Sequence, residues 1–391
     1  MKKKLAIIGA SYLQKPLVIK AKQMGYETHV FAWEEGAVCR VLADYFYPIS
    51  ITEHDAILDI CSGMDFSGIV SIASDLATVA VNYVAERLGL IGNSMECTLI
   101  STNKYLMRKK LKDNGIACPR FTCFDAGSKF EDLEGMSLPI ILKPVDRSGS
   151  RGVSLVGDIL KLNIAIDCAC RESLTGTAII EEYIEGREIS VETLSWKGEH
   201  YILQFTDKDT TGAPHFVEKG HHQPADLTQI EIELVSELVQ KSLDALGVYY
   251  GASHTEIRIN NDGKPYIIEV GARMGGDLIG SDLVELSTGY DFVKGVIQIA
   301  TGAFEKPNLN RRGYSGIHYV YPKPGILTGV VYKGSDYVVS HDVLVPIGHN
   351  IIKISDSSQR PAYYIYKSLR KIDYDPNELV LITEDRVENT I

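Results

Sequence analysis

Residues 140–154, IILKPVDRSGSRGVS, place a lysine in an apolar predicted strand and follow it with a turn rich in serine and glycine. A lysine in such a strand is costly unless it meets an anion or reaches water. The backbone N–H groups of the turn could cradle phosphates. The segment therefore predicts a nucleotide phosphate site made of Lys143, Ser148, Gly149, Ser150 and Gly152. It is not a P-loop, and a flexible hairpin turn beside an edge-strand lysine is the alternative.

A second pair of charges lies thirteen residues apart, at Glu256 and Glu269. The two predicted strands that carry them are joined by Asn261-Asp262-Gly263, a strong turn signal. Cross-strand pairing can bring both carboxylates to one face, where they repel unless a cation lies between them. Mg²⁺ prefers carboxylate and phosphate oxygens. The pattern predicts a magnesium site, with two surface glutamates on an ordinary hairpin as the alternative.

Residues 179–192, IIEEYIEGREISVE, run from a predicted strand through an acidic connector into a new strand. Such a hinge offers backbone N–H and C=O groups to an adenine edge and a carboxylate to a ribose. By itself the segment is weak evidence, because a solvated turn between strands explains it better.

Three of the ten histidines, His215, His221 and His222, lie within the polar segment from Pro214 to Pro224. Zinc binding is one interpretation, but no cysteine or acid lies at regular ligand spacing. A loop that lines an acyl-acceptor site, with His221 or Glu218 polarising the amine, is a second interpretation. A solvated loop is the third.

The elements that must position these residues fall into three regions. Strands alternate with helices of about ten residues through the first hundred positions, which predicts a parallel sheet. The middle region contains a charged helix at 102–114, hairpins at 139–156 and 251–270, and a long helix at 227–246. A polar loop is expected at 207–227. The region from 306 is expected to be mostly β, with one helix near 362–371.

Composition excludes several classes. The 391 residues are 45% hydrophobic, which is enough to form hydrophobic cores. The net charge of -11 disfavours sequence-independent binding of nucleic acid. No apolar run reaches the length of a membrane span. The seven scattered cysteines include no Cys-x-x-Cys pair, so we expect reduced thiols in a cytoplasmic protein.

The order and spacing of these segments resemble the ATP-grasp superfamily over about residues 100–305. The resemblance implies that Lys104 and Lys143 bind the nucleotide and that residues 148–152 form a mobile phosphate loop. It implies an adenine hinge at Glu181, Glu182 and Ile184, a ribose-binding carboxylate at Glu188, metal-binding acids at Glu256 and Glu269, and a catalytic arginine at Arg273. The family's Glu-x-Asn-x-Arg ending has Gly271 in place of Asn here, which leaves the number of metal ions open.

Within the superfamily the chain resembles carboxylate–amine ligases, similar to carbamoyl-phosphate synthase large-chain halves and bacterial L-amino-acid ligases. Three segments carry this likeness: residues 9–17 (GASYLQKPL), Ser74-Asp75 and residues 271–277 (GARMGGD). The first two follow predicted strands, where open α/β sheets place ligand-binding loops. The resemblance implies that ATP, with Mg²⁺ or Mn²⁺, converts a carboxylate into an acyl phosphate, which an amine then attacks.

The resemblance also implies an organisation of the chain. We expect an α/β domain at 1–100, an ATP-grasp domain at 101–305 with a lid at about 115–185, and a mostly β region at 306–391. The expected partners are small carboxylates and amines, without nucleic acid or membrane, and the chain could form a homodimer. Two rival functions stay open: a bicarbonate-activating enzyme like biotin carboxylase, and a non-catalytic ATP-binding regulator.

Overall fold

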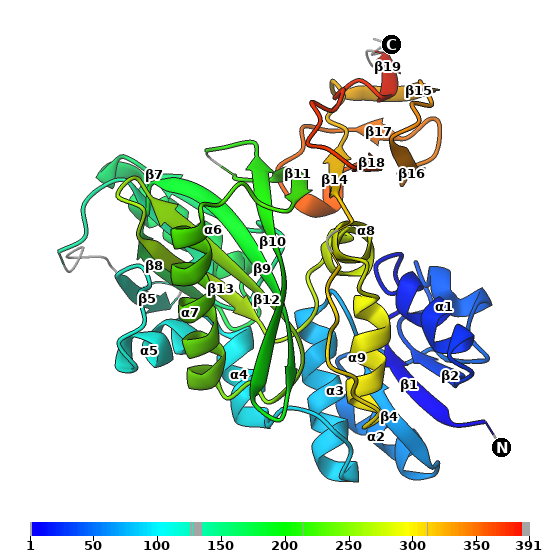
Figure 1. Ribbon diagram of the computed structural model, residues 1–391. Helices are drawn as coiled ribbons and strands as arrows, with labels where there is room; N and C mark the ends of the chain where they lie inside the picture. Colours follow the sequence, from blue (N-terminus) through cyan, green and yellow to red (C-terminus); the bar gives the residue numbers. More distant parts are fainter. Residues whose placement is uncertain (1, 126, 128–134, 214, 311, 385–391) are drawn as a thin grey trace, which may run out of the picture. The chain divides into compact units, whose positions relative to one another are not determined.

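The computed structural model describes residues 2–384 except 126, 128–134, 214 and 311 (Figure 1). The chain forms two compact units, each built from three separate segments. Unit 1 consists of Met1–Pro119, Ile184–Phe205 and Asp226–Arg311, and unit 2 consists of Arg120–Tyr183, Thr206–Ala225 and Arg312–Ile391. The division at residues 100 and 305 stays a prediction, and part of the expected lid lies outside the described residues.

Unit 1 begins with the parallel sheet that the sequence predicts, in the order β3-β2-β1-β4. Its strands are β1 (Lys4–Ile8), β2 (Glu27–Phe31), β3 (Tyr45–Tyr47) and β4 (Phe66–Val70). Alternate residues of β1 face opposite sides, so Leu5 and Ile7 pack with α1 (Lys15–Gln23) and α9 (Phe292–Ala300). Ala6 and Ile8 pack with α2 (His54–Ser62) and α3 (Asp75–Leu88) on the other side (Figure 1).

The second sheet of unit 1 is antiparallel and carries strands in the order β13-β12-β9-β10. These are β9 (Gly186–Trp196), β10 (Glu199–Thr210), β12 (Tyr250–Asn260) and β13 (Pro265–Gly271), and the last five residues of β10 belong to unit 2. The predicted hairpin of β12 and β13 is confirmed. The remaining helices of unit 1 are α4 (Met95–Thr102), α5 (Lys104–Asp113), α7 (Gln229–Leu246) and α8 (Val284–Thr288). The side chain of Asn103 caps α5, which places Lys104 at its first position.

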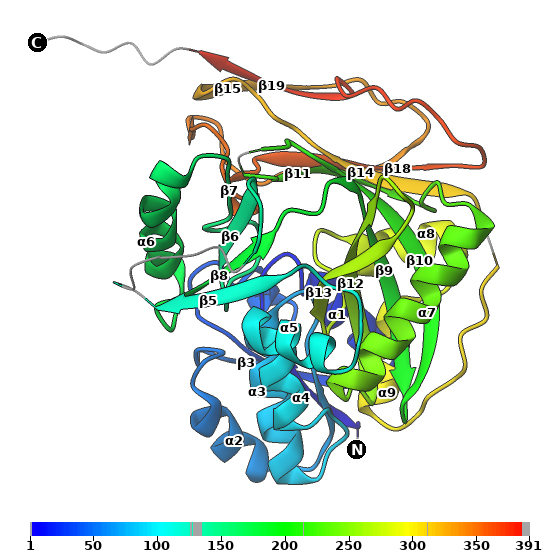
Figure 2. The same ribbon diagram turned by 90° about the vertical axis from the view of Figure 1, so that its left-hand side faces the viewer.

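Unit 2 contains a four-stranded antiparallel sheet in the order β5-β8-β6-β7, covered by α6 (Leu162–Glu172) (Figure 2). Its strands are β5 (Phe121–Asp125), β6 (Ile140–Pro144), β7 (Ser154–Val156) and β8 (Thr177–Glu182). The predicted antiparallel pairing of β6 with β7 is confirmed. The turn between them is the candidate phosphate loop.

The rest of unit 2 is β, as expected for the C-terminal region. The end of β10 pairs with β11 (Glu218–Gln223), and the order continues through β14 (Tyr314–Tyr319), β18 (Ala362–Ser368) and β16 (Val338–Val343). A smaller sheet contains β17 (Asn350–Ile351), β15 (Gly325–Tyr332) and β19 (Leu379–Glu384).

Two predicted elements are wrong. The expected helix near 362–371 is strand β18, because the tyrosines and isoleucine of AYYIYKS favour a strand and this strand pairs with both β14 and β16. The expected loop at 207–227 instead holds the end of β10 and all of β11, where paired neighbours satisfy the backbone of a polar sequence. Within the described residues, no helix combines the length and the hydropathy that a membrane crossing needs.

Candidate functional site

Polar side chains of unit 1 line up on paired strands at alternate positions. Glu188, Ser190 and Glu192 of β9 lie directly opposite Arg258, Glu256 and His254 of β12. Because side chains alternate between faces along a strand, each set shares one face. This period-two polar pattern inside apolar strands is the signal that could have identified Glu192 and His254 from the sequence.

Glu256 and Glu269 are register partners on β12 and β13, as the hairpin predicts. Their side chains are partly exposed, at 23% and 22%. The Nζ of Lys104 lies 2.9 Å from Oε1 of Glu269. The structure therefore brings together a predicted nucleotide lysine and both predicted metal ligands. Two opposed carboxylates offer the hard oxygen donors that suit Mg²⁺.

A buried glutamate–histidine pair lies next to these two glutamates. Glu192 is fully buried and contacts Nδ1 of His254, whose Nε2 lies 3.5 Å from Glu256. Burial alone would lower the pKa of His254, but the charges of Glu192 and Glu256 outweigh it and raise that pKa to about 9. Glu192 also accepts a hydrogen bond from the backbone N–H of Gly275 at 3.2 Å. It thereby links the strand to the loop that follows Arg273.

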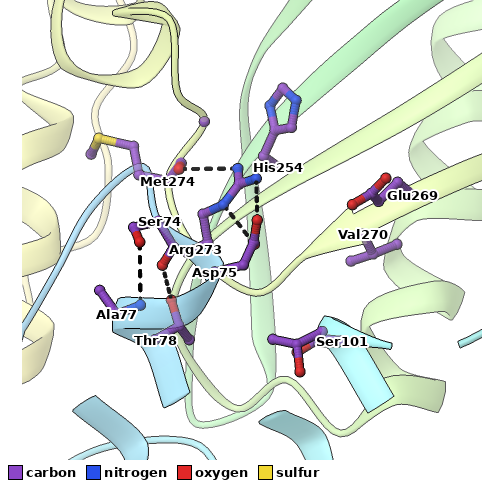
Figure 3. A network of polar contacts seen from close by, with 12 residues as sticks. Ser74, Asp75, Ala77, Thr78, Ser101, His254, Glu269, Val270, Arg273 and Met274 are labelled. Atoms are coloured by element: carbon purple, nitrogen blue, oxygen red, sulfur yellow. Dashed lines mark hydrogen bonds and ion pairs between the residues drawn. The ribbon is translucent and has the colours of Figure 1, made fainter. Parts of the chain in front are cut away.

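Arg273 is held by Asp75, a residue to which the sequence assigned no individual role. Its Nε and Nη2 donate to the two carboxylate oxygens of Asp75 at 2.9 and 3.2 Å (Figure 3). Burial opposes ionisation of Asp75, but the charges of Arg273, Lys104 and His254 hold its pKa below the usual value. A Cβ added at Gly271 would lie 3.1 Å from Cζ of Arg273. The glycine at the family's Asn position therefore leaves room for this arginine conformation.

We expect Asp75→Asn to lower kcat on the order of tenfold to a hundredfold, because the bidentate contact that orients Arg273 is lost. The KM for ATP should change little, and steady-state kinetics measures both values. Asp244→Asn is the matched control. Asp244 is an exposed acid of unit 1, and its side chain pairs with His200. A kcat equal to that of the parent protein would show that Asp75 does not position Arg273.

One arginine of unit 1 contacts both the predicted ribose-binding carboxylate and part of the predicted adenine hinge. Arg258 donates to Glu188 at 2.9 Å and to the backbone oxygen of Ile184 at 3.0 Å. Ile184 is buried. Arg258 thus fixes the start of β9 relative to the segment that precedes it.

In unit 2 the strand-borne lysine is paired with an acid of the predicted hinge. Nζ of Lys143 lies 2.7 Å from Oε2 of Glu181, and their side chains are only 7% and 3% exposed. Glu182, the next hinge residue, accepts hydrogen bonds from the guanidinium of Arg120, which lowers the pKa of Glu182. The two central strands of this sheet, β6 and β8, therefore place all three predicted residues next to each other.

The candidate phosphate loop adopts a conformation that requires its glycines. Gly149, Ser150 and Gly152 have positive φ angles of 70°, 59° and 68°. A Cβ at Gly152 would lie 2.9 Å from Pro144, so a larger residue does not fit. The loop is also tethered within unit 2: the N–H of Ser357 donates to the oxygen of Gly149 at 3.4 Å, and Ser150 donates to the oxygen of Phe216 at 3.3 Å.

Ser357 links this loop to β11, because its hydroxyl donates to Oε2 of Glu218 at 2.8 Å. We expect Ser357→Ala to speed hydrogen exchange at residues 147–153 on the order of fivefold, as a hydrogen bond to a charged acceptor contributes about 1 kcal/mol or more. Ser358→Ala is the control, since its hydroxyl donates to Asp356 instead. Equal exchange in both variants would show that the tether does not restrain the loop.

The histidines of the 214–224 segment have separate surroundings. His221 is buried in β11 with its ring edge against Tyr319, whereas His222 contacts Asp209 and Tyr366. Glu218 and His221 lie on either side of a β-bulge in β11, and Lys208, the register partner of His221, lies 3.7 Å from Glu218. Over the described residues no group of three or more His, Cys, Asp or Glu side chains could hold a metal ion, which disfavours a zinc site. Pro214 lies outside the described residues.

A comparison with known protein families finds a match in the middle of the chain. Residues 136–282 match the model of a family described as the ATP-grasp domain. The chain contains an ATP-grasp domain. The alanine–anticapsin ligase of Bacillus subtilis is 25% identical to this ATP-grasp protein over 305 residues, which are 68% of this chain and 64% of that one.

Solved structures share the fold of nearly the whole chain. An L-amino acid ligase from Bacillus licheniformis has a TM-score of 0.84 at 24% identity, with 98% of this chain and 99% of that chain covered. The biotin carboxylase domain of Hydrogenobacter thermophilus 2-oxoglutarate carboxylase, in complex with MgADP and bicarbonate, has a TM-score of 0.75 at 20% identity, with 95% and 87% covered. The predicted fold is confirmed. The chain spans about half to two thirds of the length of the curated relatives it matches.

Proposed function

We propose that the protein is an ATP-dependent carboxylate–amine ligase. It would phosphorylate a carboxylate with ATP, and an amine would then displace phosphate to give an amide, ADP and phosphate. The observation that carries the proposal is the pair of opposed carboxylates, Glu256 and Glu269, set beside Lys104 in a chain with an ATP-grasp domain. Relatives named as amino-acid ligases support the reaction class.

The ATP contacts are proposed residue by residue. The phosphates would be bound by Lys104, Lys143, Ser148, Gly149, Ser150 and Gly152, the adenine by Glu181, Glu182 and Ile184, and the ribose by Glu188. Glu256 and Glu269 would hold Mg²⁺, and Mn²⁺ could replace it. The bound cation would neutralise charge on the transferring phosphoryl group.

The reaction itself would depend on groups that stabilise crowded anions. Arg273 and Lys143 would stabilise the negative charge that develops during phosphoryl transfer and amine attack. Asp75 would act through Arg273 as a positioning residue. His221 is proposed as the group that polarises the amine or the intermediate, and Glu218 as the alternative.

The cellular compartment and the partners of the protein are also proposals. All seven cysteines are free thiols in the structure, and four of them are buried, which suits the reducing cytoplasm. The partners would be small carboxylates and amines, and a homodimer could form without contributing to this site.

A phosphate-release screen tests the proposed function. Each carboxylic acid is incubated with ATP, Mg²⁺ and pooled amino acids, and phosphate is measured with and without each component. The proposal expects release that needs both an acid and an amine. Release that needs bicarbonate and biotin but no amine would favour a carboxylase. Tight ATP binding without ADP formation across the whole panel would favour a regulator.

A further inference from the structure

A pocket of about 290 Å³ lies in unit 1 where β1 and β2 end. It brings together two segments that the sequence analysis singled out as ligand-binding loops, the 9–17 segment and the segment at Ser74-Asp75. Its walls include Gly9, Ser11, Gln14, Trp33, Glu35 and Ser74. Its position at the carboxyl ends of parallel strands is the place where open α/β sheets bind ligands.

The pocket adjoins the arginine of the candidate site. Ala73 and Ser74 form one wall, and the next residue, Asp75, holds Arg273. A Cβ added at Gly276, on the loop after Arg273, would lie 4.0 Å from Cβ of Ala73. The pocket therefore lies close to the residues proposed to act on the reacting carboxylate.

Several hydrogen-bond donors of the wall are already used within the protein. The buried amide of Gln14 donates to the oxygen of Ile72 at 2.8 Å and accepts from Ser11 at 2.7 and 3.0 Å. The backbone N–H groups of Gly9, Leu13 and Ala37 donate to Phe31, Ser11 and Glu34. Phosphate is bound by N–H groups that point into a cavity, and these donors point elsewhere.

The groups that the wall still offers suit a cation. Glu35 is the only ionisable side chain among the lining residues, and no Lys, Arg or His is among them. Arg40, on the neighbouring turn, is paired with Glu34. Trp33 is 66% exposed, so its indole ring is accessible to a ligand in the pocket. A carboxylate and an exposed indole together attract ammonium and guanidinium groups.

We propose that this pocket binds the ammonium- or guanidinium-bearing end of one substrate, such as the side chain of a basic amino acid. That the bound molecule is a substrate rests on the proposed ligase function, whereas cation binding in the pocket does not. The same lining disfavours a phosphoribosyl group, so the pocket would separate this protein from ligases that act on phosphoribosylamine.

Tryptophan fluorescence tests the binding without any turnover. The chain has two tryptophans, and Trp196 stacks on Phe304 in unit 1. A Trp196→Phe variant keeps an aromatic ring there and leaves Trp33 as the sole reporter. Titration with L-arginine or L-lysine should give a saturable change in Trp33 emission. Norleucine and ribose 5-phosphate should give none at the same concentrations.

An exposed acid outside the pocket supplies a matched control. In the Trp196→Phe background, Glu35→Gln should weaken arginine binding about tenfold or more, because a charge-assisted contact is lost. Glu237→Gln on α7, where the carboxylate pairs with Lys241, removes the same charge outside the pocket lining and should leave binding within about twofold. No response to either basic amino acid, equal effects of the two variants, or a response to ribose 5-phosphate would each overturn the proposal. Turnover with neutral amines alone would leave the ligase function standing while rejecting this pocket as its specificity site.

Discussion

A Glu269→Gln variant is expected to lose turnover on the order of a thousandfold while it keeps its fold. Glu269 and Glu256 are opposed on β13 and β12, and Glu269 contacts Lys104 at 2.9 Å. The amide retains an oxygen that can accept from Lys104 but loses the charge that a hard cation needs. Initial rates of ADP formation and the thermal midpoint of unfolding measure the two effects separately.

The control for this variant is Glu237→Gln on α7, an exposed acid that pairs with Lys241. It should change neither the rate nor the midpoint measurably, because exposed pairs contribute little to stability. Normal turnover of Glu269→Gln would contradict the metal assignment. A large drop in the midpoint would show that Glu269 is needed mainly to balance the buried Lys104.

A Lys143→Met variant is expected to lose ATP binding and also stability. The carboxylate of Glu181 is buried and lies 2.7 Å from Lys143, so removing the cation should cost about 3–5 kcal/mol in the free energy of unfolding. The double variant Lys143→Met with Glu181→Gln should regain most of that loss, because no buried charge is left without its partner. Urea unfolding measures the stability, and calorimetric titration with a non-hydrolysable ATP analogue measures the binding.

The two measurements separate a structural lysine from a nucleotide lysine. If the double variant regains both stability and ATP binding, Lys143 serves only to neutralise Glu181. The account expects stability to return and ATP binding to remain at least about tenfold weaker than in the single variant Glu181→Gln, since a charge-assisted contact to phosphate is worth about 1.5–3 kcal/mol.

The candidate cations of the site are balanced by acids within the protein. Lys104 contacts Glu269, Lys143 contacts Glu181, and Arg258 contacts Glu188. In each pair at least one partner is a residue proposed to bind ATP or its metal ion. Binding must therefore exchange or share these contacts, which couples metal binding at Glu269 to phosphate binding at Lys104.

The sequence alone predicts those parts of the site that lie on single hairpins. The facing of Glu256 and Glu269 follows from a tight turn and strand alternation, and so does the pairing of β6 with β7. Contacts between distant segments do not follow from local pattern. Asp75 and Arg273 are 198 residues apart, and only the fold shows that Gly271 leaves space for their contact.

In the C-terminal region, local sequence pattern does not determine the secondary structure. The tyrosines of β18 fit a strand by propensity, but the segment also resembles a short helix until its partners β14 and β16 are known. The role of Ser357, which contacts both Gly149 and Glu218, depends on chain segments more than a hundred residues away. No local pattern could have indicated it.

Transfer of an isotopic label tests the central claim most directly. The carboxylic acid found in the phosphate-release screen is labelled with ¹⁸O in its carboxylate and incubated with ATP, Mg²⁺ and the amine. An acyl phosphate leaves one carboxylate oxygen on the phosphate when the amine attacks, so mass spectrometry should find one ¹⁸O in the released phosphate for each amide formed. Amide formation with unlabelled phosphate would contradict the proposed ligase mechanism.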